Sequence, residues 1–173
     1  MEIRSRKSDQ KGMPIFHFTF HAYRSWNADH EEGYRQHGQR GIIPPDDGIA
    51  RYRNRIARFP KVVFNTETQN IFVVTARSVC SGRKWRLHAI VATTSHVHLA
   101  VSWGTEEPVS VVQGTLKRLM SREMGRLTHD GLTHRFSRGA SHTRIRDRSH
   151  LRQLVNEYYP QHSGVYWKEQ IQR

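Results

Sequence analysis

The sequence predicts an α+β domain in which an antiparallel sheet carries helices packed on one face, as in ferredoxin-like folds. Three segments alternate with the period of two that is typical of strands, at residues 16–20, 85–92 and 96–103. Apolar residues at helical spacing lie between and after these segments. The predicted order is strand, two helices, two strands, helix, strand and helix, which fits one antiparallel sheet covered by helices.

The first strand has two chemically different faces. Aromatic residues alternate with histidine and threonine, as Phe16, Phe18 and Phe20 against His17, Thr19 and His21. Alternate strand residues point to opposite faces, so the aromatic rings should enter the core and the imidazoles should lie on the open face. A polar stretch with several glycines follows from about residue 24 to 48, and loops this long in a compact domain are often functional.

Two helices are expected before the central strands. The first carries its apolar residues at Ile49, Tyr52, Ile56 and Phe59. Asp46 or Asp47 would cap it and Pro60 would end it, with a short strand at 61–64. The second runs from about residue 66 to 80 and is marked by Ile71, Val74, Ala76 and Val79. Ser81 and Gly82 should end it.

The second half alternates strands and helices. In the strand at 85–92, Trp85, Leu87, Ala89 and Val91 are expected to share one face. A basic helix should run from Pro108 to about residue 127, with an apolar stripe of Leu116, Leu119, Met120, Met124 and Leu127. A short strand at about 143–146 and a last helix capped by Ser149 complete the domain. Pro160 should end or kink that helix.

Composition favours a nucleic-acid partner. Lys and Arg total 28 against 15 Asp and Glu, a net charge of +13. Such a surplus favours binding to phosphates, and Arg grips a phosphate with two donors. A membrane surface or a protein partner is the less favoured alternative. We expect DNA contacts from three basic regions: Arg51, Arg55 and Arg58; Lys117, Arg118 and Arg122; and Arg138, Arg144 and Arg146.

Further composition limits concern location and domain organisation. The single cysteine, Cys80, excludes an intrachain disulfide and a cysteine-based zinc site. No run of about 18 apolar residues is present that would span a membrane. We therefore expect a cytoplasmic protein associated with the bacterial nucleoid. Residues 1–14 should form a mobile basic tail, and residues 15–173 a single catalytic domain.

Histidines and tyrosines carry the candidate chemistry. His96 and His98 are two apart in a predicted strand, so their imidazoles lie side by side and could hold one divalent metal. Tyr158 and His162 are four apart, on one face if the helix continues. A tyrosine beside a metal can attack a phosphodiester. His17 and His21 would face the same surface. We interpret them as polar residues of the sheet face in preference to metal ligands.

These segments together resemble the HUH single-tyrosine transposases, a family that includes the REP-associated tyrosine transposases. ATTSHVHLAVSW is similar to their His-hydrophobe-His strand, and FTFHAYRSWNADHEEG to their first strand and following loop. The segment from Arg135 to Trp167 is similar to their closing region. The residues before His96 are Thr-Thr-Ser, where many relatives carry Pro-Asn.

The resemblance implies a set of roles. His96, His98 and His162 would hold Mg²⁺ or Mn²⁺, and Tyr158 would be the nucleophile that forms a 5′-phosphotyrosine link and frees a 3′-hydroxyl. The substrate would be single-stranded or hairpin DNA, cut by a monomer or a homodimer. The adjacent Tyr159 is an alternative nucleophile and Gln161 an alternative ligand, because Pro160 interrupts the spacing.

Other functions compete with this interpretation. A nucleic-acid-binding domain of ferredoxin-like fold without catalysis would share the charge and the sheet, but RNA-binding domains of that fold carry a Gly- and aromatic-rich strand that is missing here. HUH enzymes of plasmid replication or transfer are usually larger. A purely structural metal site is disfavoured by two histidines without cysteine.

Overall fold

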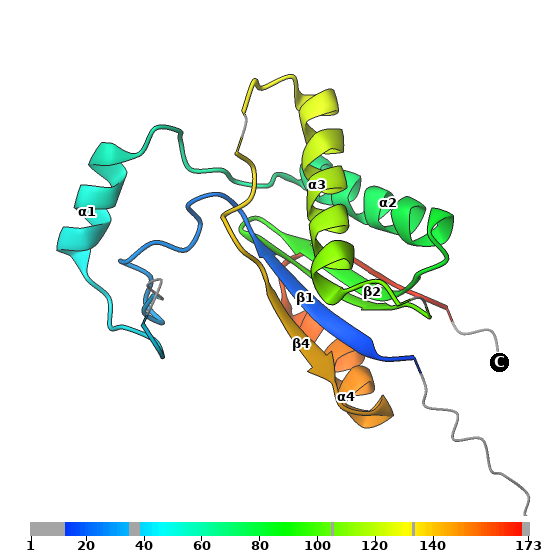
Figure 1. The fold of residues 1–173 in the computed structure, drawn as a ribbon. Helices are drawn as coiled ribbons and strands as arrows, with labels where there is room; N and C mark the ends of the chain where they lie inside the picture. The colour runs from blue at the N-terminus through cyan, green and yellow to red at the C-terminus, as the bar shows by residue number, and fades with distance from the viewer. Residues whose placement is uncertain (1–12, 35–38, 105, 133, 171–173) are drawn as a thin grey trace, which may run out of the picture.

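The computed structural model describes residues 13–34, 39–104, 106–132 and 134–170. Its centre is a five-stranded antiparallel sheet in the order β4-β1-β3-β2-β5 (Figure 1). The strands are β1 (Ile15–His21), β2 (Arg86–Thr93), β3 (His96–Ser102), β4 (Ser141–Ile145) and β5 (Gly164–Lys168). Most of the predicted tail at 1–14 lies outside the described residues.

The first four strands have the ferredoxin-like arrangement. Helix α2 (Thr66–Gly82) connects β1 to β2, and α3 (Val109–Thr128) connects β3 to β4. β3 lies between β1 and β2 and is antiparallel to both. This βαββαβ order confirms the predicted fold class. No helix among the described residues has the length and apolar character needed to cross a bilayer.

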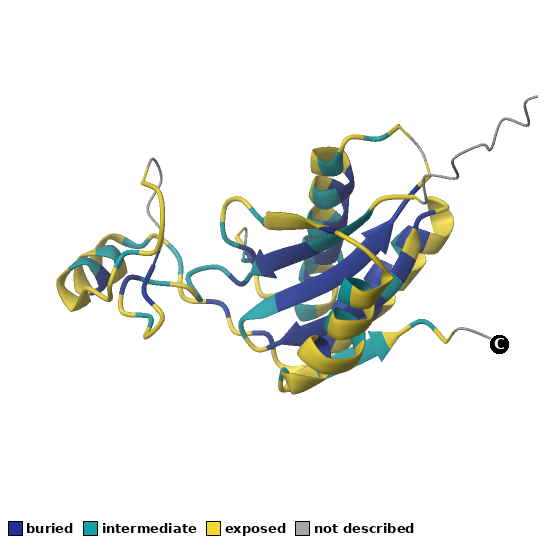
Figure 2. Ribbon diagram, turned by 90° about the horizontal axis from the view of Figure 1, so that it is seen from below, coloured by how far each residue is buried: buried dark blue, intermediate teal, exposed yellow. Residues whose placement is uncertain are grey.

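The main core lies between the sheet and the two long helices. The Phe18 and Phe20 rings of β1 are fully buried there, with Leu99 of β3 and Leu116 and Met120 of α3. Figure 2 shows the central strands as the most buried part of the chain. Of the predicted apolar stripe of α3, Leu116, Met120 and Met124 are buried in this core, whereas Leu119 is only half-buried and Leu127 is 48% exposed.

The inward face of α2 agrees only in part with the prediction, since Ala76 is buried and Val79 packs against the core. Phe72, Val73, Ala76 and Cys80 are buried, whereas Val74 is 63% exposed. The predicted alternation along β2 also fails. The pairing of β2 with β3 shifts between Leu87 and Ala89, so Leu87 packs in the main core while Ala89 faces the opposite side. An inserted bulge residue reverses which alternate positions face inward.

The polar stretch after β1 forms a separate lobe with α1 (Asp47–Ile56) (Figures 1 and 2). Ala28, Tyr34 and Ala50 form its small core. The Asp46 carboxylate accepts from the Ile49 N–H and caps α1, as predicted. The helix ends at Ile56, however, before Phe59. The predicted strand at 61–64 is absent, because Val62 and Phe64 donate instead to carbonyls of Tyr23 and Thr94 in loops.

The C-terminal segment covers the face of the sheet opposite α2 and α3. The sequence predicts helices on one face only. It consists of α4 (Arg148–Gln153), a π-helical turn η1 (Leu154–Tyr158) and a 3₁₀ turn η2 (Tyr159–Gln161). Its apolar side chains pack with Ala89, Val91 and Ala100 of the sheet in a second cluster that includes Leu151, Leu154, Val155 and Tyr159. The cap of α4 is Asp147, which accepts from the His150 N–H, and not the predicted Ser149.

Pro160 helps to explain the π-helical turn. The Tyr159 N–H donates to the Leu154 carbonyl, five residues back. In this register the N–H of residue 160 would donate to the Val155 carbonyl, but Pro160 has no N–H. The Tyr166 hydroxyl of β5 donates to that carbonyl instead, at 2.6 Å. Through this hydrogen bond, strand β5 holds the C-terminal turns against the sheet. The sequence did not predict this strand.

We predict opposite effects for alanine at two glycines. A Cβ at Gly164 would lie 2.1 Å from the Ala92 carbonyl oxygen, whereas a Cβ at Gly114 in α3 meets nothing within 4 Å. Gly164→Ala should destabilise the fold by about 1–3 kcal/mol through overpacking. Gly114→Ala should stabilise it by about 0.5–1 kcal/mol through helix propensity. Urea unfolding checks both; equal stability of the two variants would contradict the close packing of β5 on β2.

Candidate metal and nucleophile site

The pairing of β1 with β3 assembles half of the candidate site. His21 pairs with His96 and Thr19 pairs with His98 across the two strands. On β3 the His96 and His98 ring centroids are 4.6 Å apart, and Val97 and Leu99 between and beyond them are fully buried in the main core. The alternation expected from the sequence therefore places the imidazoles on the face opposite α2 and α3.

The C-terminal turns supply the other half. The His162 ring centroid lies 5.1 Å from that of His96 and 4.8 Å from that of His98. One ligand atom from each of these three residues lies within 4.8 Å of the others. The centroid of the Tyr158 ring lies 4.7 Å from the centroid of the His162 ring and 5.5 Å from that of the His98 ring. The four residues singled out in the sequence thus meet in one place.

Hydroxyl groups orient the two strand imidazoles. The Thr19 Oγ1 atom lies 2.9 Å from Nδ1 of His98, and the Ser95 Oγ atom lies 3.0 Å from Nδ1 of His96. If each Nδ1 carries the proton and donates to its hydroxyl, each Nε2 is left with a free lone pair. Ligating histidines are commonly held in this way through the other ring nitrogen. His17 also approaches His98 Nδ1, at 3.1 Å through its Nε2.

Burial keeps this group of histidines uncharged. Burial, with help from neighbouring histidines, lowers the pKa of His96 to about 4 and the pKa of His98 to about 2. Burial lowers the pKa of His17 to about 4 and also depresses the pKa of His162. The imidazoles are therefore neutral at pH 7, which is the form that binds a metal.

One buried nitrogen indicates that a cation fits the cluster. Nε2 of His162 is inaccessible to solvent and has no hydrogen-bond partner among the described residues. Buried polar atoms without partners are rare, and a bound ion is one of the usual reasons. A divalent cation held by His96, His98 and His162 would satisfy this nitrogen.

The two neighbouring tyrosines lie in different environments. Tyr158 is 39% exposed beside the histidines, and burial together with the Glu32 charge raises the pKa of its phenol. Tyr159 is fully buried in the second cluster and its ring stacks on His98, with centroids 5.9 Å apart. A DNA strand can reach Tyr158 without unfolding of the second cluster. Gln161 is exposed, whereas His162 is half-buried and belongs to the group of three histidines.

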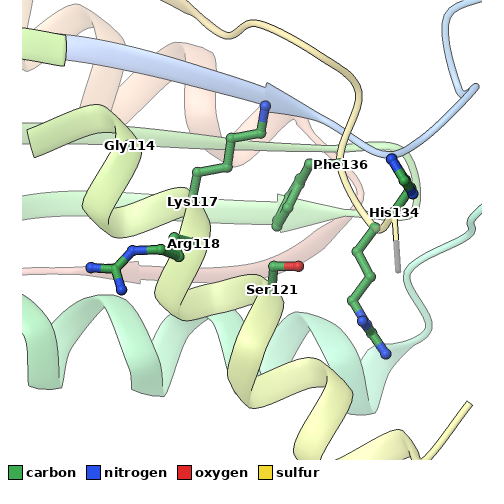
Figure 3. Close-up of a pocket in the computed structure, with 7 residues that line it drawn as sticks. Gly114, Lys117, Arg118, Ser121, His134 and Phe136 are labelled. Atoms are coloured by element: carbon green, nitrogen blue, oxygen red, sulfur yellow. The ribbon is translucent and has the colours of Figure 1, made fainter. Parts of the chain in front are cut away.

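Most of the candidate DNA-binding residues are exposed. Arg51, Arg55 and Arg58 lie on or just after α1, Arg118 and Arg122 on α3, Arg138 before β4, and Arg144 and Arg146 on or beside β4. Lys117 differs from them, because its ammonium donates to the carbonyls of Ser137 and Gly139 and is half-buried. Figure 3 shows Lys117 and Arg118 beside a cavity of about 260 Å³ that His134 and Phe136 also line.

Three contributors to the site were not identified from the sequence. Thr19 orients His98, and its position between His17 and His21 in the same alternation could have indicated it. Ser95 orients His96 from the preceding position. The charge of Glu32, in the loop after β1, helps to raise the pKa of the Tyr158 phenol, and the sequence carries no signal for this long-range effect.

The chain matches no protein-family model and no curated protein sequence. Among solved structures, one similar chain is described as a REP-associated tyrosine transposase bound to a REP hairpin. The two chains are 12% identical, with a TM-score of 0.48, and the match covers 82% of this chain and 62% of that one. This chain therefore spans less than two thirds of the transposase chain, and its function has to be inferred from its own side chains.

The histidine cluster predicts a specific metal-binding pattern. Alanine at His96, His98 or His162 should weaken Mn²⁺ binding at least about tenfold, because each removes one ligand. Isothermal titration calorimetry measures this, with His142→Ala as the control, since His142 is exposed on β4. Equal Mn²⁺ affinity in His142→Ala and the three site variants would rule out the cluster.

Thr19→Val tests the orientation of His98. Valine keeps the shape of the side chain but removes the hydroxyl 2.9 Å from Nδ1. We expect Mn²⁺ affinity to fall about 10- to 100-fold, the range for partners of ligating histidines. Thr19→Ser should restore most of the affinity. Loss in the serine variant equal to that in the valine variant would show that packing, and not the hydroxyl, matters.

Proposed function

We propose that this chain is a metal-dependent endonuclease and strand transferase that cuts single-stranded DNA beside a hairpin, with Tyr158 as the nucleophile. The observation that supports this most is the exposed Tyr158 ring next to three clustered imidazoles, 4.7 Å from His162 and 5.5 Å from His98. A phenol next to neutral imidazoles that can hold a cation is suited to phosphodiester attack.

The metal would be held by His96, His98 and His162. Imidazole nitrogens suit transition metals better than Mg²⁺, which prefers oxygen ligands. Of the two metals expected from the resemblance, the donor set therefore favours Mn²⁺. When bound, the cation would polarise the phosphoryl group and stabilise the charge that develops on it.

The protein's own part in the reaction is to position and protect the nucleophile. The Tyr158 oxygen attacks the phosphorus and loses its proton, while the bond from phosphorus to the 3′ oxygen breaks and that oxygen takes up a proton as a 3′-hydroxyl. The product is a 5′-phosphotyrosine. Its phosphodiester bond retains the energy of the bond that was cut, so the reverse attack by a 3′-hydroxyl rejoins DNA without ATP.

The positive surface supports DNA as the substrate. The net charge is +13, and exposed arginines lie on α1, α3 and β4. Their binding energy should come largely from phosphates. Hairpin DNA is proposed from the resemblance of the HUH strand and closing segment, and a single catalytic domain acting as a monomer or homodimer stays a prediction, as does its cytoplasmic location.

The nucleophile assignment predicts a sharp difference between two conservative variants. Tyr158→Phe should abolish the covalent adduct with a labelled hairpin that carries a single-stranded flank, because it removes the attacking oxygen. It should bind the DNA within about twofold of wild type. Tyr159→Phe, the matched control, should keep the adduct, because its ring is buried in the second cluster.

Denaturing gel electrophoresis in the presence of Mn²⁺ detects the adduct. An adduct that survives in Tyr158→Phe and disappears in Tyr159→Phe would move the nucleophile by one residue. A wild-type protein that binds the hairpin but forms no adduct with Mn²⁺ or Mg²⁺ would indicate a nucleic-acid-binding domain without catalysis.

A further inference from the structure

A cavity of about 760 Å³ lies at the end of the sheet, between the lobe of α1 and the segment before β4. This volume is within the range of typical ligand pockets, about 300–1,000 Å³. Two segments line most of it, residues 23–27 after β1 and residues 53–58 of α1 and the turn that follows. The third wall is His134, Phe136, Ser137 and Arg138.

The cavity is strongly positive. Four of its lining residues are arginines, at positions 24, 53, 58 and 138, and none of its lining residues is acidic. Arg24 donates to the Phe59 carbonyl and to the Asn54 side chain, both of which are neutral. The guanidinium groups of Arg53 and Arg58 lie over the rings of Tyr34 and Phe59. No ion pair among the described residues cancels any of these four charges.

An exposed aromatic ring completes the cavity wall. Trp26 is 38% exposed and lines the cavity. Its ring stacks on His30 with centroids 4.0 Å apart and an interplanar angle of 8°, and its Nε1 donates to the Gly33 carbonyl at 3.0 Å. The ring is therefore held in a defined orientation. A rigid aromatic face beside unneutralised arginines is the combination that binds single-stranded nucleic acid, because the ring stacks on a base and the cations bind phosphates.

Ring contacts connect the cavity to the histidine cluster. The Trp26 ring meets the His21 ring at 5.2 Å, and His21 meets His96 at 6.0 Å. The cavity also shares His134 and Phe136 with the smaller cavity beside Lys117 and Arg118 in Figure 3. A strand whose scissile phosphate lies at Tyr158 can thus continue into the larger cavity.

We infer that this cavity binds a single-stranded nucleotide that flanks the cleavage site, with Trp26 stacking on the base and Arg53, Arg58 and Arg138 binding its phosphates. This inference rests on the proposed function for the direction of the strand. The chemistry of the ligand, an unstacked base with its phosphates, comes from the cavity itself.

Binding of a fluorescein-labelled ten-nucleotide oligothymidine tests the inference. Fluorescence anisotropy in EDTA removes any contribution from adduct formation. Trp26→Ala should raise the Kd at least about fivefold, in line with the loss of one stacked base. Arg58→Ala should raise it by a similar factor. The matched controls are Tyr52→Ala, which removes an exposed ring, and Arg77→Ala, which removes an exposed arginine that lies over the Trp167 ring as Arg58 lies over Phe59. Both residues lie outside the cavity, and both variants should stay within about twofold.

The Trp26→Phe variant distinguishes a loss of stacking from a loss of folding. It keeps an aromatic face, although the phenyl ring is smaller than the indole and lacks the Nε1 donor, so it should retain most of the binding and unfold at a similar temperature. In addition, an oligonucleotide that carries 5-iodouracil should cross-link under ultraviolet light to a peptide that contains Trp26. Cross-links found only elsewhere would overturn the inference, whatever the stability of the variants.

Two further outcomes would also overturn it. One is an equal loss of affinity for a blunt ten-base-pair duplex in Trp26→Ala, which would indicate a general backbone surface. The other is unchanged oligothymidine binding in both Trp26→Ala and Arg58→Ala. If that happens while wild type forms the Tyr158 adduct, the cavity assignment fails and the nuclease stands. If Trp26→Ala and Arg58→Ala lose affinity for oligothymidine but wild type forms no adduct, the cavity assignment stands and the nuclease proposal fails.

Discussion

The histidine site depends on the register in which β1 pairs with β3. That register sets Thr19 opposite His98 and His21 opposite His96, while Phe18 meets Leu99 on the other side of the sheet. A slip of one residue would turn the imidazoles of β3 toward the core and its valines and leucine toward the site. The stacked aromatic core under α2 and α3 makes such a slip costly. Packing on one face of the sheet therefore holds the chemical groups of the other face in place.

The π-helical turn decides which of the two tyrosines is buried in the second cluster and which stays exposed beside the histidines. In an uninterrupted α-helix, Leu151, Leu154, Val155 and residue 158 would share one face. A π turn inserts one residue, so Tyr159 takes the place in the apolar cluster that Tyr158 would have occupied. Tyr158 is turned toward the imidazoles instead. The missing N–H of Pro160 and the Tyr166 hydroxyl on Val155 stabilise this arrangement. Such turns occur frequently at functional sites.

Charge is divided sharply between the interior of the site and its surroundings. The clustered imidazoles stay neutral, because burial and their mutual proximity lower their pKa values. Arg24, Arg53 and Arg58 of the cavity at the end of the sheet lie next to neutral partners. In the proposed function these arginines would attract a polyanionic strand, while the neutral imidazoles would accept a metal cation. Attraction of the strand and binding of the cation therefore do not compete. If the imidazoles were charged, the cluster would repel the cation.

The sequence by itself determined the fold class, the faces of β1 and β3 and the histidine pair, and it limited the cap of α1 to Asp46 or Asp47, because alternation and capping are local properties. It left Tyr158 and Tyr159 undecided, together with Gln161 and His162, and it wrongly placed a cap at Ser149 and a strand at residues 61–64. It also gave β2 an unbroken alternation and omitted β5. The tertiary structure corrected the cap, the strand and the alternation of β2, and added β5. It leaves Tyr158 exposed and His162 beside the histidine pair, with Tyr159 buried and Gln161 exposed, while the nucleophile and the ligand set stay predictions. The bulge in β2, the donor for the Val155 carbonyl and the cavity beside Trp26 arise between segments far apart in the chain, and local periodicity carries no information about such contacts.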